Sequence, residues 1–483
     1  MWFNAKKIFS SVVVFCSCLF FSSNANAIDL AEAVEVAVES NPEIGQAVQN
    51  REAIEFELRQ ARGLYLPSID LESAGGVRRL DSPSRSLLGF DDDLQTPVEG
   101  SLVLTQTLYN GGQRRAERDR QASRVDSASF RILERSEDIG LQVVREYLEY
   151  LLQNRIINQA AANLSFHKSI RNSISSAISA GTLTEADRQQ VSERLFASEA
   201  RLKEAQEALN VAENQFIRLV GKPIGRARLP GSVAHGMPKN LPEALGSGRK
   251  NNPRIKLAEA DVDVADALVK AAEGRRLPEV FLETRGRAGR DIDGSDGRTT
   301  DLEARVVARW NIFRGGIDKA NKQEQIRRAS EQRLVLHQMH REVDQAIRAA
   351  WNRRIRQRSL SDTLKRQARE NSNLVSSYRQ QFSVGQRSLL DVLDAQNTNF
   401  NVNVLATSAD FAALFADYQL LAASGRLLRT LSVTKPQQSK AYAREEFDVP
   451  PTPVVETQKR QPSRQVRGEL PLDILAPLRE KNN

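Results

Sequence analysis

Two carboxylates stand three residues apart in a short stretch that separates two long helical runs. The stretch 382–397 holds Gly385, Ser388, Asp391 and Asp394. Ser-x-x-Asp before an apolar run is typical of a helix start, so we predict the turn of a helical hairpin with both carboxylates on one face. One such pair is an ordinary solvated face. Several copies converging on an axis would repel one another, raise one another's pKa and attract cations, as in a selective constriction rather than a catalytic dyad.

Histidines are the other side chains here that could bind a metal or transfer protons. The chain has four, and they are scattered: His167, His235, His337 and His340. The last two have helical spacing, but no acid or cysteine completes a ligand set beside them, so a structural role is predicted. We therefore expect no enzyme site, no cofactor and no metal.

Two glycine pairs and one arginine-rich run have ordinary structural interpretations. Neither Gly111–Gly112 nor Gly315–Gly316 is followed by Gly-Lys-Ser/Thr, so a phosphate loop is not indicated. Both pairs are instead expected to adopt positive φ at a strand-to-helix turn. The arginine-rich run 353–358 could suggest nucleic acid, but arginine on a solvated helix face is the usual case in an exported protein. No nucleic-acid partner is expected.

Residues 1–27 have the pattern of a secretory signal peptide. Two lysines precede a short apolar stretch, and Ala-Asn-Ala at 25–27 is a cleavage site. Both cysteines, Cys16 and Cys18, leave with this segment, so no disulfide or cysteine metal site is expected in the mature chain. Neither cysteine stands at a lipoprotein junction, so the protein is expected to be exported without a lipid anchor. No later apolar run reaches about 18 residues, which leaves a chain free in the envelope or a β-barrel in an outer membrane.

The composition favours long helices over one globular core. The chain has 483 residues, of which 40% are hydrophobic, 27% charged and only 6% aromatic, with a formal charge of +8. This length predicts two domains or a repeat. A repeat is present: Asn-Pro at 41 and at 252 share an offset of 211, and the Gly-Gly pairs share an offset of 204. The first copy is 28–235 and the second is 236–430.

Each copy shows the same order of predicted elements. In the first copy these are a helix at about 30–62, a strand hairpin at 68–108, a long helix at 113–180 and a returning helix at 184–220. In the second copy they are 241–274, 279–312, 317–384 and 388–430. Each long helix would measure about 100 Å, and its sparse apolar stripes favour helix-on-helix packing in a tube. Residues 431–483, rich in Pro, Gln and charged residues, are predicted to be a disordered tail.

The strands alternate between two unlike faces. In 301–312, Leu302 and Val306 alternate with Glu303 and Arg305, so one face is apolar and the other charged. The two copies supply four strands, which cannot close a barrel, and open edges cannot lie in lipid. Three chains would supply about 12 strands. The alternative is a pair of soluble hairpins on a small sandwich. The predicted fold class is mainly α, internally duplicated, with a transmembrane β-barrel part.

With these features in place, the chain resembles the TolC family of outer-membrane channel-tunnels. The resemblance covers nearly all of 28–430 and rests on the duplication, the hairpins, the Gly-Gly turns and above all the tip sequence 384–396. It implies a homotrimer with a 12-stranded barrel in outer-membrane lipid and a helical tunnel across the periplasm. The partners it implies are a periplasmic adaptor (membrane fusion) protein and an inner-membrane ABC or RND pump.

The resemblance also assigns roles to residues of both hairpin tips. Asp391 and Asp394 resemble the family's two aspartate rings at the periplasmic entrance, Arg387 resembles the arginine of the closed-state latch, and Asp187 resembles one of its acceptors. Phe382 stands where a latch tyrosine is found and has no hydroxyl. The residues that would dock the adaptor share a place at the tips: Gly181, Leu183, Gly385, Arg387, Ser388 and Leu389.

The function implied is that of a passive exit duct for an exporter. It would conduct secreted proteins (type I secretion), drugs or other toxic compounds from the pump to the outside. One alternative is an outer-membrane factor dedicated to efflux of small molecules or metals. A periplasmic coiled-coil structural protein and an envelope hydrolase are the other classes left open by the residues. The first would lack the strand hairpins, and the second would need a clustered polar pocket that the sequence does not indicate.

Overall fold

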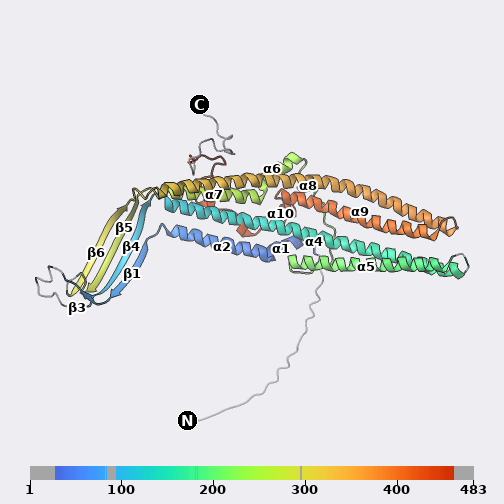
Figure 1. The fold of residues 1–483 in the computed structure, drawn as a ribbon, viewed down its shortest axis with the longest axis horizontal. Coiled ribbons are helices and arrows are strands. Elements are labelled where there is room, and N and C mark those ends of the chain that lie inside the picture. The colour runs from blue at the N-terminus through green and yellow to red at the C-terminus, as the bar shows by residue number, and fades with distance from the viewer. Residues whose placement is uncertain are drawn as a thin grey trace, which may run out of the picture.

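The computed structural model describes residues 28–461 apart from 82, 84–86, 88–93, 180, 182 and 294–295, with only the backbone described at 175–177. The predicted signal peptide and residues 462–483 lie outside the described residues. The chain is elongated, with the strands at one end and two helical hairpins at the other (Figure 1). Within the described part of the chain, every helix is too short or too polar to cross a membrane.

Both copies of the repeat share the same order of main helices and strands. The first has α1 (Leu30–Ser40), α2 (Pro42–Gly63), β1 (Ser68–Gly75), β4 (Val98–Asn110), α4 (Gln113–Ser179) and α5 (Glu185–Val220). Within its strand hairpin, β2 (Arg78–Arg79) and β3 (Leu94–Gln95) form a short ribbon. The second has α6 (Leu241–Asn251), α7 (Pro253–Gly274), β5 (Glu279–Arg290), β6 (Arg298–Arg309), α8 (Ile317–Ser383), α9 (Leu389–Ala423) and α10 (Leu427–Thr430).

Three predicted helices are each divided in two. The helix expected at 30–62 breaks at Asn41 and that expected at 241–274 breaks at Asn252, because the following proline lacks an amide donor and holds the residue before it in an extended conformation. The returning helix expected at 388–430 ends at Ala423 instead. Gly425, with φ of +65°, turns the chain there before α10 begins.

The two break-point asparagines make equivalent bonds in the two copies. Each side-chain oxygen caps the helix that follows, and each amide nitrogen donates to the last turn of a returning helix. Asn41 donates to the Leu219 carbonyl at 3.1 Å, and Asn252 donates to the Ala423 carbonyl at 3.0 Å. Thus α2 continues the line of α5, and α7 continues the line of α9, along the long helices (Figure 1).

The four main strands form one antiparallel sheet in the order β1-β4-β5-β6. The two copies meet where β4 pairs with β5, with Ser101 opposite Arg287. Charged residues pair across one face, as where Arg305 donates to Glu283 at 3.1 Å. Apolar residues of the opposite face are exposed, Leu71 by 79% and Leu302 by 80%. Strands β1 and β6 are the two edges of this sheet.

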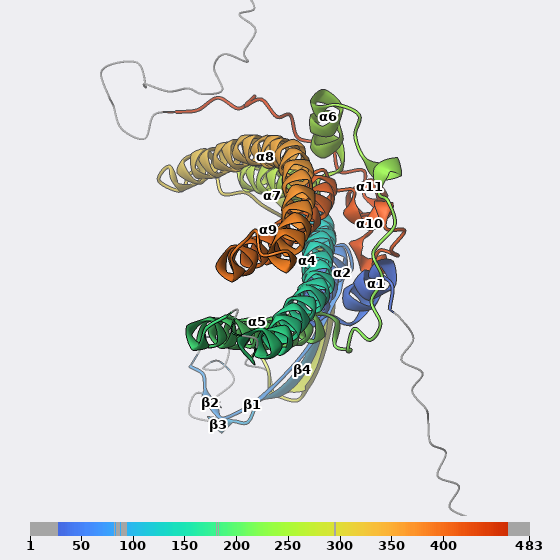
Figure 2. The same ribbon diagram turned by 90° about the vertical axis from the view of Figure 1, so that its right-hand side faces the viewer.

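The helices form one curved layer. Seen along the molecule, α8, α9, α4 and α5 follow an arc, and the short helices α1, α6, α10 and α11 (Ala443–Glu446) lie on its convex side (Figure 2). The largest core cluster lies where α1 and α10 cover the middle of α4 and α9, around fully buried Tyr147, Phe216 and Tyr418. This packing fixes the long helices at mid-length and leaves the hairpins to project beyond it.

The prediction of a disordered tail is wrong for residues 431–461, which we call the C-terminal strap. The Arg444 guanidinium bridges Asp126 of α4 at 3.0 Å and Asp263 of α7 at 2.7 Å. Further along, Glu456 pairs with Arg333 of α8 at 3.1 Å, and both side chains are 1% exposed. Composition predicted disorder because the strap is poor in apolar residues. It is held instead by charges on helix faces that are distant in sequence and by a small apolar cluster that the strap shares with α2 and α4.

Candidate functional site

Both hairpin tips lie at the end of the molecule farthest from the sheet (Figure 1). The first tip joins α4 to α5 and the second joins α8 to α9. Gly181 and Gly385 have φ of +73° and +76°, which a side chain with a Cβ adopts only at a cost. Ala180 and Thr182 lie outside the described residues. The second tip carries both candidate constriction carboxylates in the first two turns of α9.

Each returning helix begins with a side-chain cap, as the sequence pattern predicts for the second tip. Ser388 caps α9, its hydroxyl accepting from the Asp391 amide at 3.2 Å and donating to the Asp391 carboxylate at 2.8 Å. Thr184 and Asp187 form a full capping box at the start of α5. The Thr184 amide and hydroxyl both donate to the Asp187 carboxylate, and these bonds hold the pKa of Asp187 below its usual range.

Arg387 does not reach the acceptor that the resemblance assigns to it within one chain. Among the described residues, no ion pair joins Arg387 to Asp187. Its guanidinium lies over the Tyr378 ring, 4.2 Å from the centroid, and donates to Gln381 at 3.1 Å. Its nearest carboxylate is Asp391 at 3.9 Å. The latch between Arg387 and Asp187 therefore stays a prediction.

Sequence reasoning missed Tyr378 and Arg194. Tyr378 stands one helical turn before Phe382, so its position could have been noticed from helical periodicity. Arg194 of α5 donates from Nη2 to Oδ1 of Asp394 on α9 at 3.1 Å, across the two hairpins. No local spacing links two residues in different copies of the repeat, so the sequence carried no signal for this pair.

The predicted docking residues differ in their exposure. Gly181 and Gly385 are exposed at the tips, and Leu183 and Ser388 lie beside them. Leu389 is only 3% exposed, because it packs with Leu393 inside a cluster shared by both hairpins. Its side chain is therefore part of the tip's core in this conformation and not a free contact surface.

The strand-to-helix glycines stand at the opposite end of the long helices. All four have positive φ: 64° and 83° at Gly111 and Gly112, and 59° and 83° at Gly315 and Gly316. Gly111 is also constrained by space, since a Cβ there would overlap the Gly274 carbonyl oxygen at the end of α7. These turns set the direction in which each long helix leaves the sheet.

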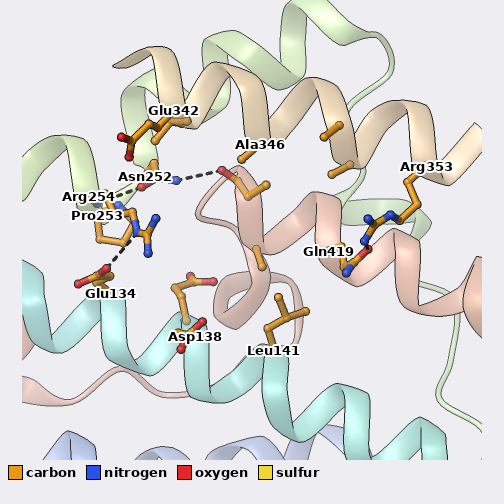
Figure 3. A pocket seen from close by; sticks show the side chains of 16 residues that line it. Glu134, Asp138, Leu141, Asn252, Pro253, Arg254, Glu342, Ala346, Arg353 and Gln419 are labelled. Carbon is orange, nitrogen blue, oxygen red and sulfur yellow. Dashed lines mark hydrogen bonds and ion pairs between the residues drawn. The ribbon is translucent and has the colours of Figure 1, made fainter. Parts of the chain in front are cut away.

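A pocket of about 340 Å³ lined by both charged and apolar side chains lies at mid-length, between α4, α7, α8 and α9. Its charged side chains are paired with one another or with neighbours (Figure 3): Glu134 with Arg254 at 3.0 Å, and Arg353 with Gln419 at 3.1 Å. Asn252, which joins α7 to α9, forms part of its wall. In the described part of the chain, no group of three or more His, Cys, Asp or Glu side chains is placed to hold a metal ion. The charges that line the pocket thus have partners among neighbouring side chains.

Comparison with known proteins gives one consistent result. The family model described as "Outer membrane efflux protein" matches residues 33–222 and 244–426. The outer membrane efflux protein BepC of Brucella suis is 24% identical over 87% of this chain and 91% of its own length. The outer membrane protein TolC of Escherichia coli is 22% identical over 84% of each chain. The solved outer membrane channel CmeC of Campylobacter jejuni shares the fold, with a TM-score of 0.73, 15% identity and coverage of 87% of this chain and 89% of that one.

Proposed function

This chain belongs to the outer membrane efflux protein family, and on that premise we propose that three copies form the passive exit duct of a tripartite exporter. The observation that carries this proposal is the separation of two unlike surfaces. An exposed apolar sheet face lies at one end, and exposed paired carboxylates lie at the other. Between them, α4 and α8 each have 67 residues, about 100 Å of helix. Such a chain can place one end in outer-membrane lipid and the other deep in the periplasm.

The open sheet edges support three copies. An apolar sheet with unpaired edges is not stable in lipid, because backbone groups there find no water. Pairing of β6 in one copy with β1 in the next would satisfy both edges. Three copies of a four-stranded sheet give a barrel of about 12 strands, an even number that suits an outer-membrane barrel. The apolar residues Leu71 and Leu302 would then face lipid and the charged pairs the lumen.

In this trimer the second tip becomes the periplasmic constriction. Asp391 and Asp394 are 44% and 56% exposed in the single chain, so both carboxylates can reach solvent and face an axis. Three copies would make two stacked acidic rings that select for cations and oppose anions. The two tips together would dock a periplasmic adaptor, which connects this duct to an ABC or RND pump in the inner membrane. We propose no catalytic role for this chain. We assign its ion pairs to packing between helices and its tip carboxylates to the constriction.

Planar-bilayer recording tests the constriction. We expect Asp391→Ala combined with Asp394→Ala to raise the single-channel conductance and to abolish block by hexamminecobalt(III), because both rings of carboxylates that hold the trivalent cation are removed. Asp362→Ala, which removes an exposed carboxylate of α8 away from the tips, is the matched control and should leave the block intact. If hexamminecobalt(III) blocked the double variant at the same concentration as wild type, Asp391 and Asp394 would not form the constriction.

A further inference from the structure

Near the tips, within a few helical turns of them, the two hairpins of one chain pack against each other. One apolar cluster contains residues from α4, α5 and α9, and Phe382 of α8 packs against it. Its buried members are Ile170, Ile174, Val191, Leu389 and Leu393. The cluster is small compared with the core at mid-length. Contacts beside it therefore have a strong influence on whether the hairpins stay together.

Two polar links between the hairpins accompany this cluster. Gln396 of α9 donates to Asn163 of α4 at 2.8 Å in a buried setting. Closer to the tip, Arg194 of α5 pairs with Asp394 of α9 at 3.1 Å. Arg194 belongs to the first copy of the repeat and Asp394 to the second. The pair thus ties the hairpin that carries the candidate constriction to its neighbour.

The surroundings of Arg194 direct its charge toward Asp394. Its side chain is 31% exposed, its Nε lies 3.5 Å from Glu193 on its own helix, and its Nη2 lies on Asp394. His167 of α4 is 2% exposed nearby. Burial, and then the charge of Arg194, lower the pKa of His167, so the imidazole is neutral near pH 7. Arg194 is therefore the cation that contacts Asp394.

The two constriction carboxylates consequently have different partners. Asp391 is engaged by the Ser388 cap at the start of its own helix, with Arg387 at 3.9 Å. Asp394 pairs directly with a cation from the other hairpin. If three chains surround an axis, three Arg194 side chains offset three of the six ring charges.

We infer that Arg194 sets the effective charge of the Asp394 ring and tethers the constriction hairpin to the α4–α5 hairpin. This inference rests on the proposed function, since it needs the ring of three chains. Arg194 acts on the conducted ion through Asp394, so it is a positioning residue. Movement of α9 away from α5 would both release the tether and expose the full charge of the ring.

The test is bilayer recording of the purified full-length trimer with hexamminecobalt(III) as the probe. Arg194→Gln should lower the half-blocking concentration of hexamminecobalt(III) about tenfold, because three Arg194 cations no longer compete with it for the Asp394 carboxylates. The same variant should raise the resting conductance, because the tether is lost. Arg194→Lys should restore both quantities toward wild type. Arg201→Gln is the matched control, since Arg201 lies on the same helix and, among the described residues, pairs with Glu204 three positions on at 2.9 Å.

A charge exchange separates the tether from the charge. Arg194→Asp combined with Asp394→Arg should re-form the pair and keep the resting conductance low, while block weakens because that ring is now cationic. Unchanged block and conductance in Arg194→Gln would overturn the inference. In that case, loss of block in the Asp391→Ala and Asp394→Ala double variant would still support the proposed constriction. If the double variant kept its block, the constriction itself would be wrong, and the inference with it.

Discussion

Glu137 makes the stability of this chain depend on pH, and Glu137→Gln should remove most of that dependence. The residue lies on α4 beside the mid-length pocket and is only 6% exposed. Its carboxylate accepts from the Leu427 amide at 3.1 Å, at the start of α10. Burial raises the pKa of Glu137 from 4.5 to about 7, outweighing the charge of Lys435 and the backbone bonds, which lower it.

The sign and the size follow from these two pKa values. Between pH 4.5 and about 7 the folded chain keeps a proton that the unfolded chain has released. The free energy of unfolding therefore falls as the pH rises through this window, and the loss is complete above pH 7. At about 1.4 kcal/mol per pH unit, the cost approaches about 3 kcal/mol per chain. A glutamine accepts the same amide bond without ionising, so the variant should avoid this cost.

Thermal unfolding of the detergent-solubilised protein, followed by circular dichroism at pH 5 and pH 8, checks this prediction. We expect Glu137→Gln to be clearly more stable than wild type at pH 8, with most of that advantage lost at pH 5. Glu331→Gln, which removes an exposed carboxylate of α8, should follow wild type at both values. A constant difference between Glu137→Gln and wild type at the two pH values would refute the buried carboxylate as the source.

Two further predictions concern the turns and the strap. Gly111→Ala should destabilise the fold by at least about 2 kcal/mol in thermal unfolding, because strain at φ of +64° adds to overlap with a backbone carbonyl oxygen. Gly315→Ala, at φ of +59° with no described atom within 4 Å of the added Cβ, should cost only the strain, and an equal loss would contradict the steric argument. Glu456→Ala should cost about 3 kcal/mol, because it leaves the Arg333 guanidinium buried without its closest carboxylate. Limited proteolysis should then cleave the strap early, and unchanged resistance would show that the pair does not hold it.

The features that the sequence predicted well are those set by local spacing. Period-two alternation around Leu302 and Val306 identified β6, and the capping pattern Ser388-x-x-Asp391 identified the start of α9. The duplication identified both hairpins and the glycine turns, since a repeated motif implies a repeated structure. Each of these signals lies within a few residues of the feature that it predicts.

Two of the features that sequence reasoning missed, the ordered strap and the link between the hairpins, depend on pairs of distant residues. Arg444 and Glu456 carry no periodicity of their own, and their partners lie on α4, α7 and α8, so the strap could not be distinguished from a solvated tail. Arg194 and Asp394 are both ordinary charges on helix faces until packing places them 3.1 Å apart. Charge pairing between elements depends on the three-dimensional arrangement, which single-sequence patterns do not encode.

The asparagine bonds at Asn41 and Asn252 have a mechanical consequence. They divide the helices of the wall into two kinds. Helices α4 and α8 run unbroken past mid-length, whereas the α2–α5 and α7–α9 lines each consist of two helices that meet there. Bending a continuous helix disturbs its ladder of backbone hydrogen bonds, whereas bending where two helices meet strains one side-chain bond and the side-chain packing around it. Bending of the α2–α5 and α7–α9 lines is therefore concentrated at mid-length, beside the short helices α1, α6 and α10. The tips can shift below that level while the part of the wall next to the sheet keeps its shape.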